Sequence, residues 1–172
     1  IITPHRSLLH RGCEMDQLEE IHDGFIAIKD GKILDYGTGT FQKYLHESSY
    51  LHDALGNICI PGLIDSHTHL VHGGSRENEF KLKLQGVPYL DILKNGGGIL
   101  STVKHTRDAS FAELYQKAKK SLDEMILFGV TTVEAKSGYG LNFETELKQL
   151  KVMKVLNEDH PITISPTYLG AH

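Results

Sequence analysis

Apolar and polar residues alternate in two short runs near the start of the chain. The runs cover residues 25–29 and 32–36, and Asp30-Gly31 separates them. Asp-Gly accommodates the positive φ angles of a type I′ turn, so this pattern predicts a β-hairpin. We interpret residues 1–60 as a small β module.

After residue 60 the pattern changes to short strands that alternate with longer helices. Ser110 and Glu113 form the capping-box pattern that begins a helix, and apolar residues then recur every three or four positions up to Gly129. We expect strands at residues 63–65, 130–134 and 162–164, the first of them buried, and a second amphipathic helix at Leu147, Leu150, Met153 and Leu156. Alternation of this kind favours a parallel sheet covered by helices.

The composition is that of an ordinary globular protein. The chain has 172 residues, a formal net charge of -4 and 40% hydrophobic residues. Its basic residues are scattered, so we expect no binding to nucleic acid or to an anionic membrane surface. No apolar run approaches the roughly 20 residues of a membrane span, which favours a cytoplasmic protein.

Two histidines separated by one residue follow the first strand expected in this region. They are His67 and His69. Residues i and i+2 of a strand project to the same face, so both imidazoles can converge on one metal ion. Imidazole nitrogen is a common ligand of zinc and iron, and two such ligands leave room for others and for water.

The longer segment at residues 60–69, IPGLIDSHTH, resembles the metal-binding opening of the amidohydrolase superfamily. Members of this superfamily hydrolyse C–N and related bonds with one or two metal ions at the mouth of a (β/α)8 barrel. Many also carry a small β-sandwich. The resemblance implies an α/β fold with a partial (β/α)8 TIM-like barrel at residues 61–172, preceded by part of a small β-sandwich at residues 1–60.

Four further segments resemble, in order, one single-metal family of that superfamily. They lie at residues 69–77, 96–103, 136–141 and 169–172. Enzymes of this family hydrolyse the ring amide of 4-imidazolone-5-propanoate to N-formimidoyl-L-glutamate in histidine degradation. The resemblance implies the same small-molecule substrate, attack by a metal-activated water, and a homodimeric assembly.

The resemblance also implies roles for individual side chains. His67 and His69 correspond to ligands of one zinc or iron ion. Arg76, Tyr139 and His172 correspond to substrate-binding residues, and a guanidinium can bind a propionate carboxylate through two hydrogen bonds. No residue of this chain is assigned as the catalytic acid or base.

Two of these residues also have a simpler interpretation. Arg76 can instead form a surface ion pair with Glu77 or Glu79, and Tyr139 can be an aromatic lid over the core. Lys136 is expected to be an ordinary lysine paired with a carboxylate. His72 and His105 are expected to be solvated, and Tyr89 to line the substrate pocket.

The length of the chain leaves the predicted site incomplete. A (β/α)8 barrel takes about 250 residues, and residues 61–172 provide about three of its eight units. We therefore expect an N-terminal part of a longer protein, inactive alone, with an exposed sheet edge and with the remaining metal ligands and the general base beyond residue 172. Two alternatives stay open: another amidohydrolase that opens a cyclic amide or deaminates a base, and a non-catalytic fragment.

Overall fold

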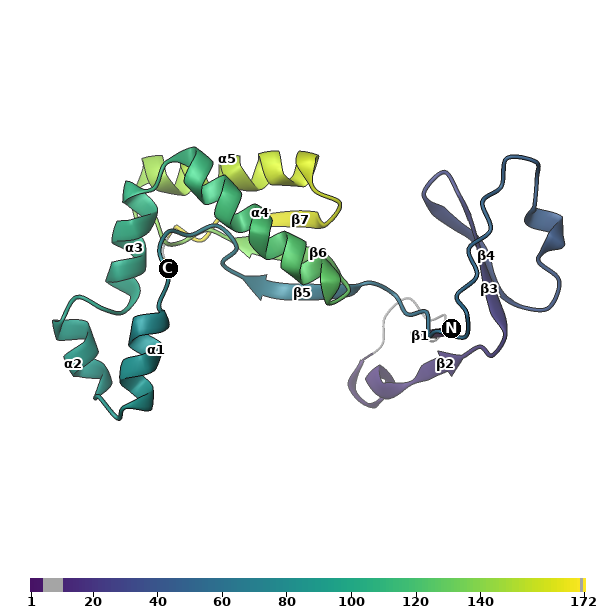
Figure 1. Ribbon diagram of the computed structural model, residues 1–172, viewed down its shortest axis with the longest axis horizontal. Coiled ribbons are helices and arrows are strands. Elements are labelled where there is room, and N and C mark those ends of the chain that lie inside the picture. The colour runs from purple at the N-terminus through teal and green to yellow at the C-terminus, as the bar shows by residue number, and fades with distance from the viewer. Residues whose placement is uncertain (5–10, 171) are drawn as a thin grey trace. The chain divides into compact units, whose positions relative to one another are not determined.

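A computed structural model describes residues 1–4, 11–170 and 172 of the chain. The chain divides into two compact units, Ile1–Pro61 and Gly62–His172. In the described residues the first unit has two two-stranded sheets and the second has one three-stranded sheet, and Figure 1 labels their strands. Ala171, within the last of the resembling segments, lies outside the described residues.

The first unit consists of short antiparallel β-structure. Its elements are β1 (Ile2–Pro4), β2 (Leu18–Glu20), β3 (Gly24–Lys29), β4 (Lys32–Thr38) and two 3-10 helices at Gly12–Asp16 and Gln42–Tyr44. β1 pairs with β2, and β3 pairs with β4. Phe25 of β3 packs against Phe41 and Tyr44, with ring centroids 6.2 and 5.7 Å away.

The predicted hairpin is confirmed in this unit. β3 and β4 are antiparallel, and Lys29 pairs with Lys32 across the turn. Asp30 and Gly31 have φ angles of 52° and 72°, as a type I′ turn requires. Aspartate and glycine both tolerate this left-handed backbone, so the turn residues determine the register of the hairpin.

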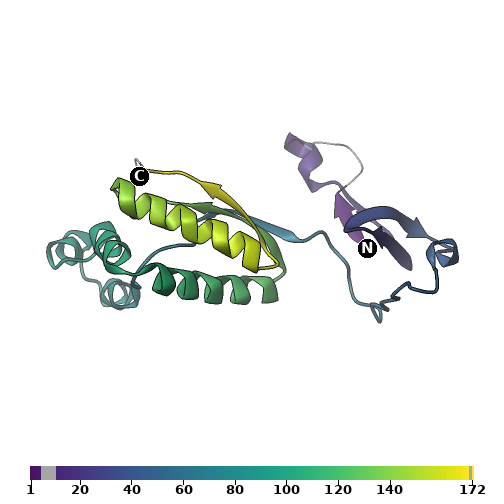
Figure 2. The same cartoon turned by 90° about the horizontal axis from the view of Figure 1, so that it is seen from above.

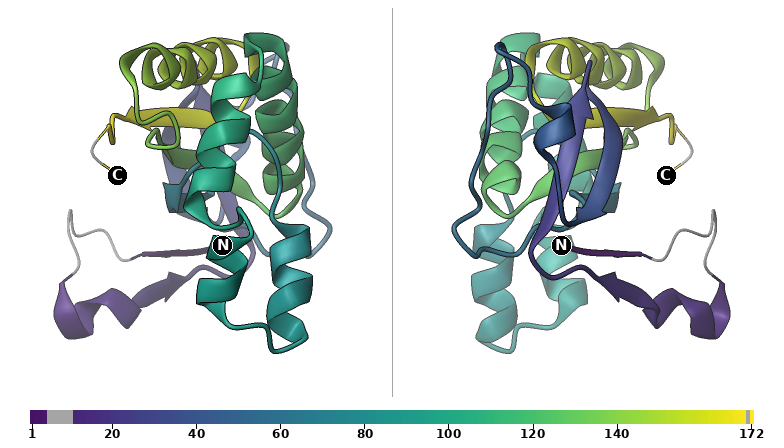
Figure 3. Two further views of the ribbon diagram at one scale, coloured as in Figure 1. Left: turned by 90° about the vertical axis from the view of Figure 1, so that its left-hand side faces the viewer. Right: turned by 90° about the vertical axis from the view of Figure 1, so that its right-hand side faces the viewer.

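The second unit is built on a parallel three-stranded sheet. Its strands are β5 (Leu63–Thr68), β6 (Val130–Lys136) and β7 (Thr163–Thr167), which lie side by side in chain order. Two long helices, α4 (Phe111–Leu127) and α5 (Phe143–Asp159), cover one face of this sheet, as Figures 2 and 3 show. The expected α/β class with parallel strands is therefore confirmed.

Capping explains where the two long helices begin. The Ser110 side chain accepts the N–H of Glu113, and the Glu113 carboxylate accepts the N–H of Ser110, which completes the predicted capping box. The side chain of Asn142 caps α5 by accepting the N–H of Thr145. Among the described residues, no helix is both long enough and apolar enough to span a bilayer.

Three shorter helices between β5 and α4 were not predicted. They are α1 (Glu77–Leu84), α2 (Tyr89–Lys94) and α3 (Ile99–Asp108). They lie beyond the carboxyl ends of the strands (Figure 1). Each is at most ten residues long, so too few turns repeat for apolar periodicity to identify it.

The core lies between the sheet and the two long helices. Its buried members include Leu122 of α4, Met153 of α5, and Val133 and Ala135 of β6. The buried residues recur with the 3.6-residue period predicted for the helices and the 2-residue period predicted for the strands. The core therefore holds the strands, and the loops at their carboxyl ends, in place.

The expectation that the first strand is buried is wrong for this chain. Leu63 and Ile64 of β5 are 47% and 70% exposed. Ile64 pairs with Thr132 of β6, whose neighbour Val133 packs against the helices. Side chains alternate across a strand, so Ile64 and Thr132 belong to the face that α4 and α5 leave uncovered.

Candidate active site

Loops at the carboxyl ends of the three parallel strands bring imidazole and phenol rings together. His69 follows β5, Tyr139 follows β6 and His172 follows β7. The centroid of the His69 ring lies 4.7 Å from that of Tyr139 and 4.7 Å from that of His172. The Tyr139 and His172 centroids are 5.2 Å apart. Parallel strands end at one edge of the sheet, so segments distant in sequence meet there. We call His67, His69, Tyr139 and His172 the ring cluster.

The two histidines of the His-x-His pair lie close enough to share one ion. Their ring centroids are 6.0 Å apart, with an angle of 70° between the ring planes. Two imidazoles on a tetrahedral zinc ion, with Zn–N bonds of about 2.0–2.1 Å, would have centroids about 5 Å apart. His67 is exposed, and a small rotation of its side chain would close the difference.

His69 has the properties of a neutral metal ligand. Its Nδ1 atom is buried and has no hydrogen-bond partner among the described residues. Burial lowers the pKa of His69, the nearby His172 lowers it further, and the main chain of Ser137 partly opposes both effects. A neutral imidazole keeps the lone pair that coordination requires. The pair therefore fits a zinc or iron ion as part of a ligand set. Within the described residues, no group of three or more His, Cys, Asp or Glu side chains completes the set.

Arg76 precedes α1 and forms an ion pair with Glu79. Its Nε and Nη2 atoms both donate to Oε2 of Glu79, and the Nε contact is 2.9 Å. Glu79 is buried, and its other oxygen accepts the N–H of Gly98 at 2.8 Å. This pairing raises the pKa of Arg76, and the nearby Tyr89 and Tyr139 contribute to the increase. Glu79 occupies one edge of the guanidinium, and no hydrogen bond from the described residues reaches Nη1.

His72 is not the solvated residue that we expected from the sequence. Its Nδ1 atom lies 2.9 Å from the carbonyl oxygen of His69, and its ring centroid lies 6.1 Å from that of Tyr139. Burial lowers the pKa of His72. The turn after β5 brings residue i+3 back to His69, which places His72 at the border of the ring cluster. His105 is exposed, as expected.

Lys136 forms the expected ion pair with a carboxylate. Its ammonium group contacts Glu134, which also accepts a 2.7 Å hydrogen bond from the hydroxyl of Thr167. Lys136 and Thr167 lower the pKa of Glu134, and His67 adds a weaker electrostatic effect. These side chains therefore form a polar layer close to His67.

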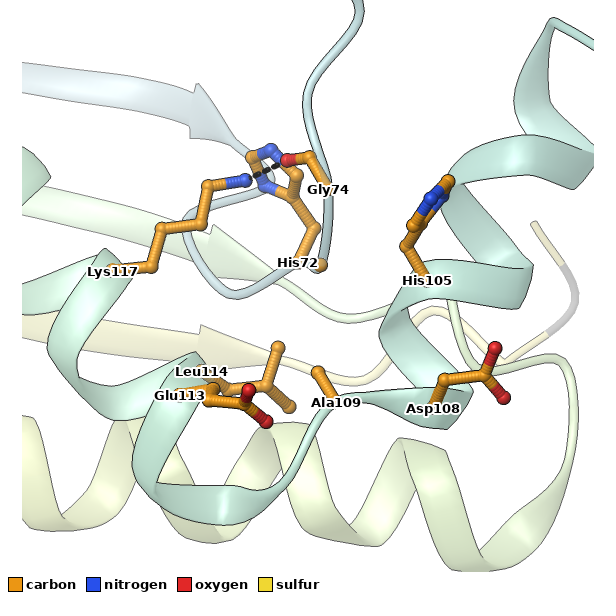
Figure 4. Close-up of a pocket in the computed structure, with 9 residues that line it drawn as sticks. His72, Gly74, His105, Asp108, Ala109, Glu113, Leu114 and Lys117 are labelled. Carbon is orange, nitrogen blue, oxygen red and sulfur yellow. Dashed lines mark hydrogen bonds between the residues drawn. The ribbon is translucent and has the colours of Figure 1, made fainter.

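A pocket of about 320 Å³ lies between the loop that follows β5 and the helices α3 and α4 (Figure 4). It is lined by His72, Gly73 and Gly74 after β5 and by residues of α3 and α4, among them His105 and Lys117. Lys117 donates to the carbonyl oxygen of Gly74, so this lysine supports the loop. The pocket shares His72 with the border of the cluster, but its lining includes neither Tyr139 nor His172.

Comparison with known proteins gives a consistent result. No family model matches the chain. Curated proteins from Alkaliphilus metalliredigens, Streptococcus gordonii and Fusobacterium nucleatum are 58%, 57% and 56% identical to it, over 164, 162 and 166 residues. These relatives are imidazolonepropionases. The similarity covers 94–95% of this chain. It confirms the predicted resemblance to the single family within the amidohydrolase superfamily.

The chain spans about two fifths of the length of the imidazolonepropionases it matches. The covered share is 39%, 38% and 40% of the three relatives. This share agrees with the expectation that the chain represents part of a longer protein.

The structure also identifies charged residues near the site that sequence reasoning missed. The carboxylate of Glu146 accepts main-chain N–H groups of the turn that carries Tyr139, and Arg107 donates to carbonyl oxygens of the same turn. A carboxylate in the first turn of a helix, as in α5, is common for electrostatic reasons alone. The sequence therefore carried no signal that Glu146 reaches the turn that carries Tyr139.

Proposed function

We propose that the protein carrying this chain hydrolyses 4-imidazolone-5-propanoate to N-formimidoyl-L-glutamate, a step of histidine degradation. The observation that carries the proposal is the ring cluster. It gathers His69, Tyr139 and His172 from three loops at one edge of the sheet. The 56–58% identity to imidazolonepropionases supports the same substrate.

We assign His67 and His69 as ligands of one zinc or iron ion. When bound, such an ion supplies a water of lowered pKa and polarises the carbonyl group of the ring amide. The spacing of the two rings and the orphaned Nδ1 atom of His69 support this assignment. Further ligands and the general base would come from sequence outside this chain.

Arg76 is proposed to bind the side-chain carboxylate of the substrate. Glu79 holds Nε and Nη2, which orients the guanidinium and leaves its Nη1–Nη2 edge for a second carboxylate. A fixed guanidinium loses little conformational entropy when the substrate binds. Arg76 would therefore combine the surface ion pair and the substrate contact, which the sequence presented as alternatives.

Tyr139 and His172 are proposed to contact the substrate ring. The His172 Nδ1 atom lies 3.1 Å from the carbonyl oxygen of Gly138, which can only accept a hydrogen bond. Nδ1 therefore carries the proton, and the Nε2 atom of a neutral His172 is an acceptor. In this state His172 would accept a hydrogen bond from a ring N–H of the substrate.

We propose that residues 61–172 form the first three units of a (β/α)8 barrel. Their strands follow one another in chain order, and both long crossover helices lie on the same face. A doubly wound sheet would instead carry helices on both faces. Residues 1–60 are proposed as part of a β-sandwich. The homodimeric assembly and the cytoplasmic location stay predictions.

The test is hydrolysis of 4-imidazolone-5-propanoate by the product of the full reading frame that contains this sequence. We expect turnover that depends on zinc or iron and is abolished in His67→Ala. The 172-residue chain alone should show no turnover. A folded, metal-loaded protein that leaves this substrate intact would refute the proposed reaction. If it instead hydrolysed another cyclic amide, only the superfamily would be supported.

A further inference from the structure

A buried carboxylate lies directly beneath the turn that carries Tyr139. Glu146, in the first turn of α5, is 2% exposed. One of its oxygens accepts the N–H of Gly138 at 2.8 Å, and the other accepts the N–H groups of Gly140 and Leu141 at 2.7 and 2.9 Å. Every peptide N–H of residues 138–141 except that of Tyr139 therefore donates to one side chain.

The carboxylate is held by main-chain groups rather than by a cation. Among the described residues, no Lys, Arg or His forms an ion pair with Glu146. A buried charge is tolerated when hydrogen bonds satisfy it, and the position at a helix N-terminus adds favourable electrostatics. The main chain at Gly140 approaches the carboxylate closely, since a Cβ atom at this position would lie 2.9 Å from Oε1 of Glu146.

A second charged side chain holds the same turn from its carbonyl side. The Nε atom of Arg107 donates to the carbonyl oxygen of Gly140 at 2.7 Å, and Nη2 donates to that of Leu141 at 3.2 Å. Gly138 and Leu141 have φ angles of 114° and 52°, which most residues rarely adopt. These contacts stabilise a turn conformation that the local sequence alone does not favour.

We call the hydrogen bonds from the main chain of residues 138–141 to Glu146 the clamp. Gly138 connects this clamp to a second member of the ring cluster. Its N–H donates to Glu146, and its carbonyl oxygen accepts from Nδ1 of His172. A Cβ atom at Gly138 would lie 2.8 Å from Cβ of His172, so the two loops are in close contact. The orientation of this peptide therefore sets both the position and the tautomer of His172.

We propose that Glu146 is a positioning residue for the reaction. Its carboxylate fixes the main chain of residues 138–141, and through it the ring of Tyr139 and the imidazole of His172. Among the described residues, the carboxylate of Glu146 hydrogen-bonds to the main chain of this turn and not to His67 or His69. The expected effect on kinetics rests on the proposed function. The hydrogen bonds of the clamp can be measured without any enzymatic activity.

The first experiment compares Glu146→Gln with the wild-type product of the full reading frame. In the glutamine variant one of the two acceptor oxygens becomes an NH2 group facing an N–H donor. We expect kcat/KM for 4-imidazolone-5-propanoate to fall about tenfold or more at unchanged metal content. Glu144→Gln, an exposed carboxylate in the same helix turn, is the matched control and should stay within about twofold.

A double-mutant cycle separates positioning from general loss of structure. If Glu146 acts through Tyr139 and His172, the effect of Glu146→Gln should be smaller in a Tyr139→Ala background, in a His172→Ala background, or in both. Multiplicative losses in both backgrounds would overturn the proposal. Glu146→Asp keeps the charge and should fall between wild type and Glu146→Gln, which provides a test should the glutamine variant fail to fold.

Amide hydrogen exchange provides the readout that needs no turnover. In Glu146→Gln we expect exchange at Gly138, Gly140 and Leu141 to accelerate about tenfold or more while α4 stays protected. Unchanged protection at these amides would overturn the clamp. Faster exchange together with a wild-type protein that does not hydrolyse the substrate would retain the clamp and reject only the proposed function.

Discussion

Replacing Arg76 by alanine tests what the guanidinium at this position contributes. In the structure Glu79 holds Nε and Nη2, while the Nη1–Nη2 edge has room for another carboxylate. Arg76→Ala removes that edge and also leaves the buried carboxylate of Glu79 with the N–H of Gly98 alone. The substitution should therefore affect substrate recognition and stability separately.

The two effects have different expected sizes. A hydrogen bond to a charged group contributes about 1.5–3 kcal/mol, and two bonds to one carboxylate are not additive, so about 3 kcal/mol is a reasonable total. Since about 1.4 kcal/mol corresponds to tenfold in rate, kcat/KM should fall about 100-fold. The side chain of Arg76 is 39% exposed, and water screens the ion pair. A buried group left short of a partner costs about 1–3 kcal/mol, and this screening places the expected loss of stability in the lower part of that range, at about 1–2 kcal/mol.

The assay compares two substrates with the product of the full reading frame. Arg76→Ala should lower kcat/KM about 100-fold for 4-imidazolone-5-propanoate, and less than about threefold for the same ring carrying an ethyl group in place of the propionate. Arg11→Ala, which removes an exposed arginine from the first unit, is the control. Equal losses for both substrates would refute carboxylate recognition and leave Arg76 with a structural role alone.

Three further outcomes test the core, the helix cap and the proposed metal site. Leu122→Ala should cost about 2–5 kcal/mol of unfolding free energy in denaturant titrations, because Leu122 is fully buried, whereas Leu127→Ala, at 83% exposed, should cost under about 0.5 kcal/mol. The N–H and hydroxyl of Ser110 lower the pKa of Glu113, so this carboxylate stabilises the fold above its ordinary pKa and ceases to do so as pH falls through the lowered value. Melting temperature should accordingly depend less on acidic pH in Glu113→Gln, and an unchanged pH profile would contradict this reasoning. His67→Ala should lose bound zinc or iron by elemental analysis, and full retention would exclude His67 as a ligand.

Local interactions explain the elements that the sequence predicted correctly. The Asp30-Gly31 turn, the Ser110 cap and the apolar period of α4 each depend on residues within a few positions of one another. Such patterns are independent of the rest of the chain. The short helices α1–α3 were missed because they have few turns and because Gly86 and residues 96–98 interrupt the pattern.

The sequence also identified the candidate site residues, but it could not show which of them contact one another. Arg76 was given two competing interpretations, and the structure shows that its ion pair with Glu79 occupies only one edge of the guanidinium. His72 was expected to be solvated, yet the turn after β5 brings it to Tyr139. Periodicity carries no information about such turns.

The sequence by itself determined the hairpin, the long helices, the three parallel strands and the residue types that suit a metal and a carboxylate. Only the tertiary structure decided that His69, Tyr139 and His172 meet, and that Glu146 and Arg107 hold the turn between them. It also decided that Ile64 lies on an uncovered face. The physical reason is the separation along the sequence of the residues that interact. Turns, caps and periods are set by neighbouring residues, whereas contacts between separate loops exist only after the helices pack against the sheet and align the ends of its strands.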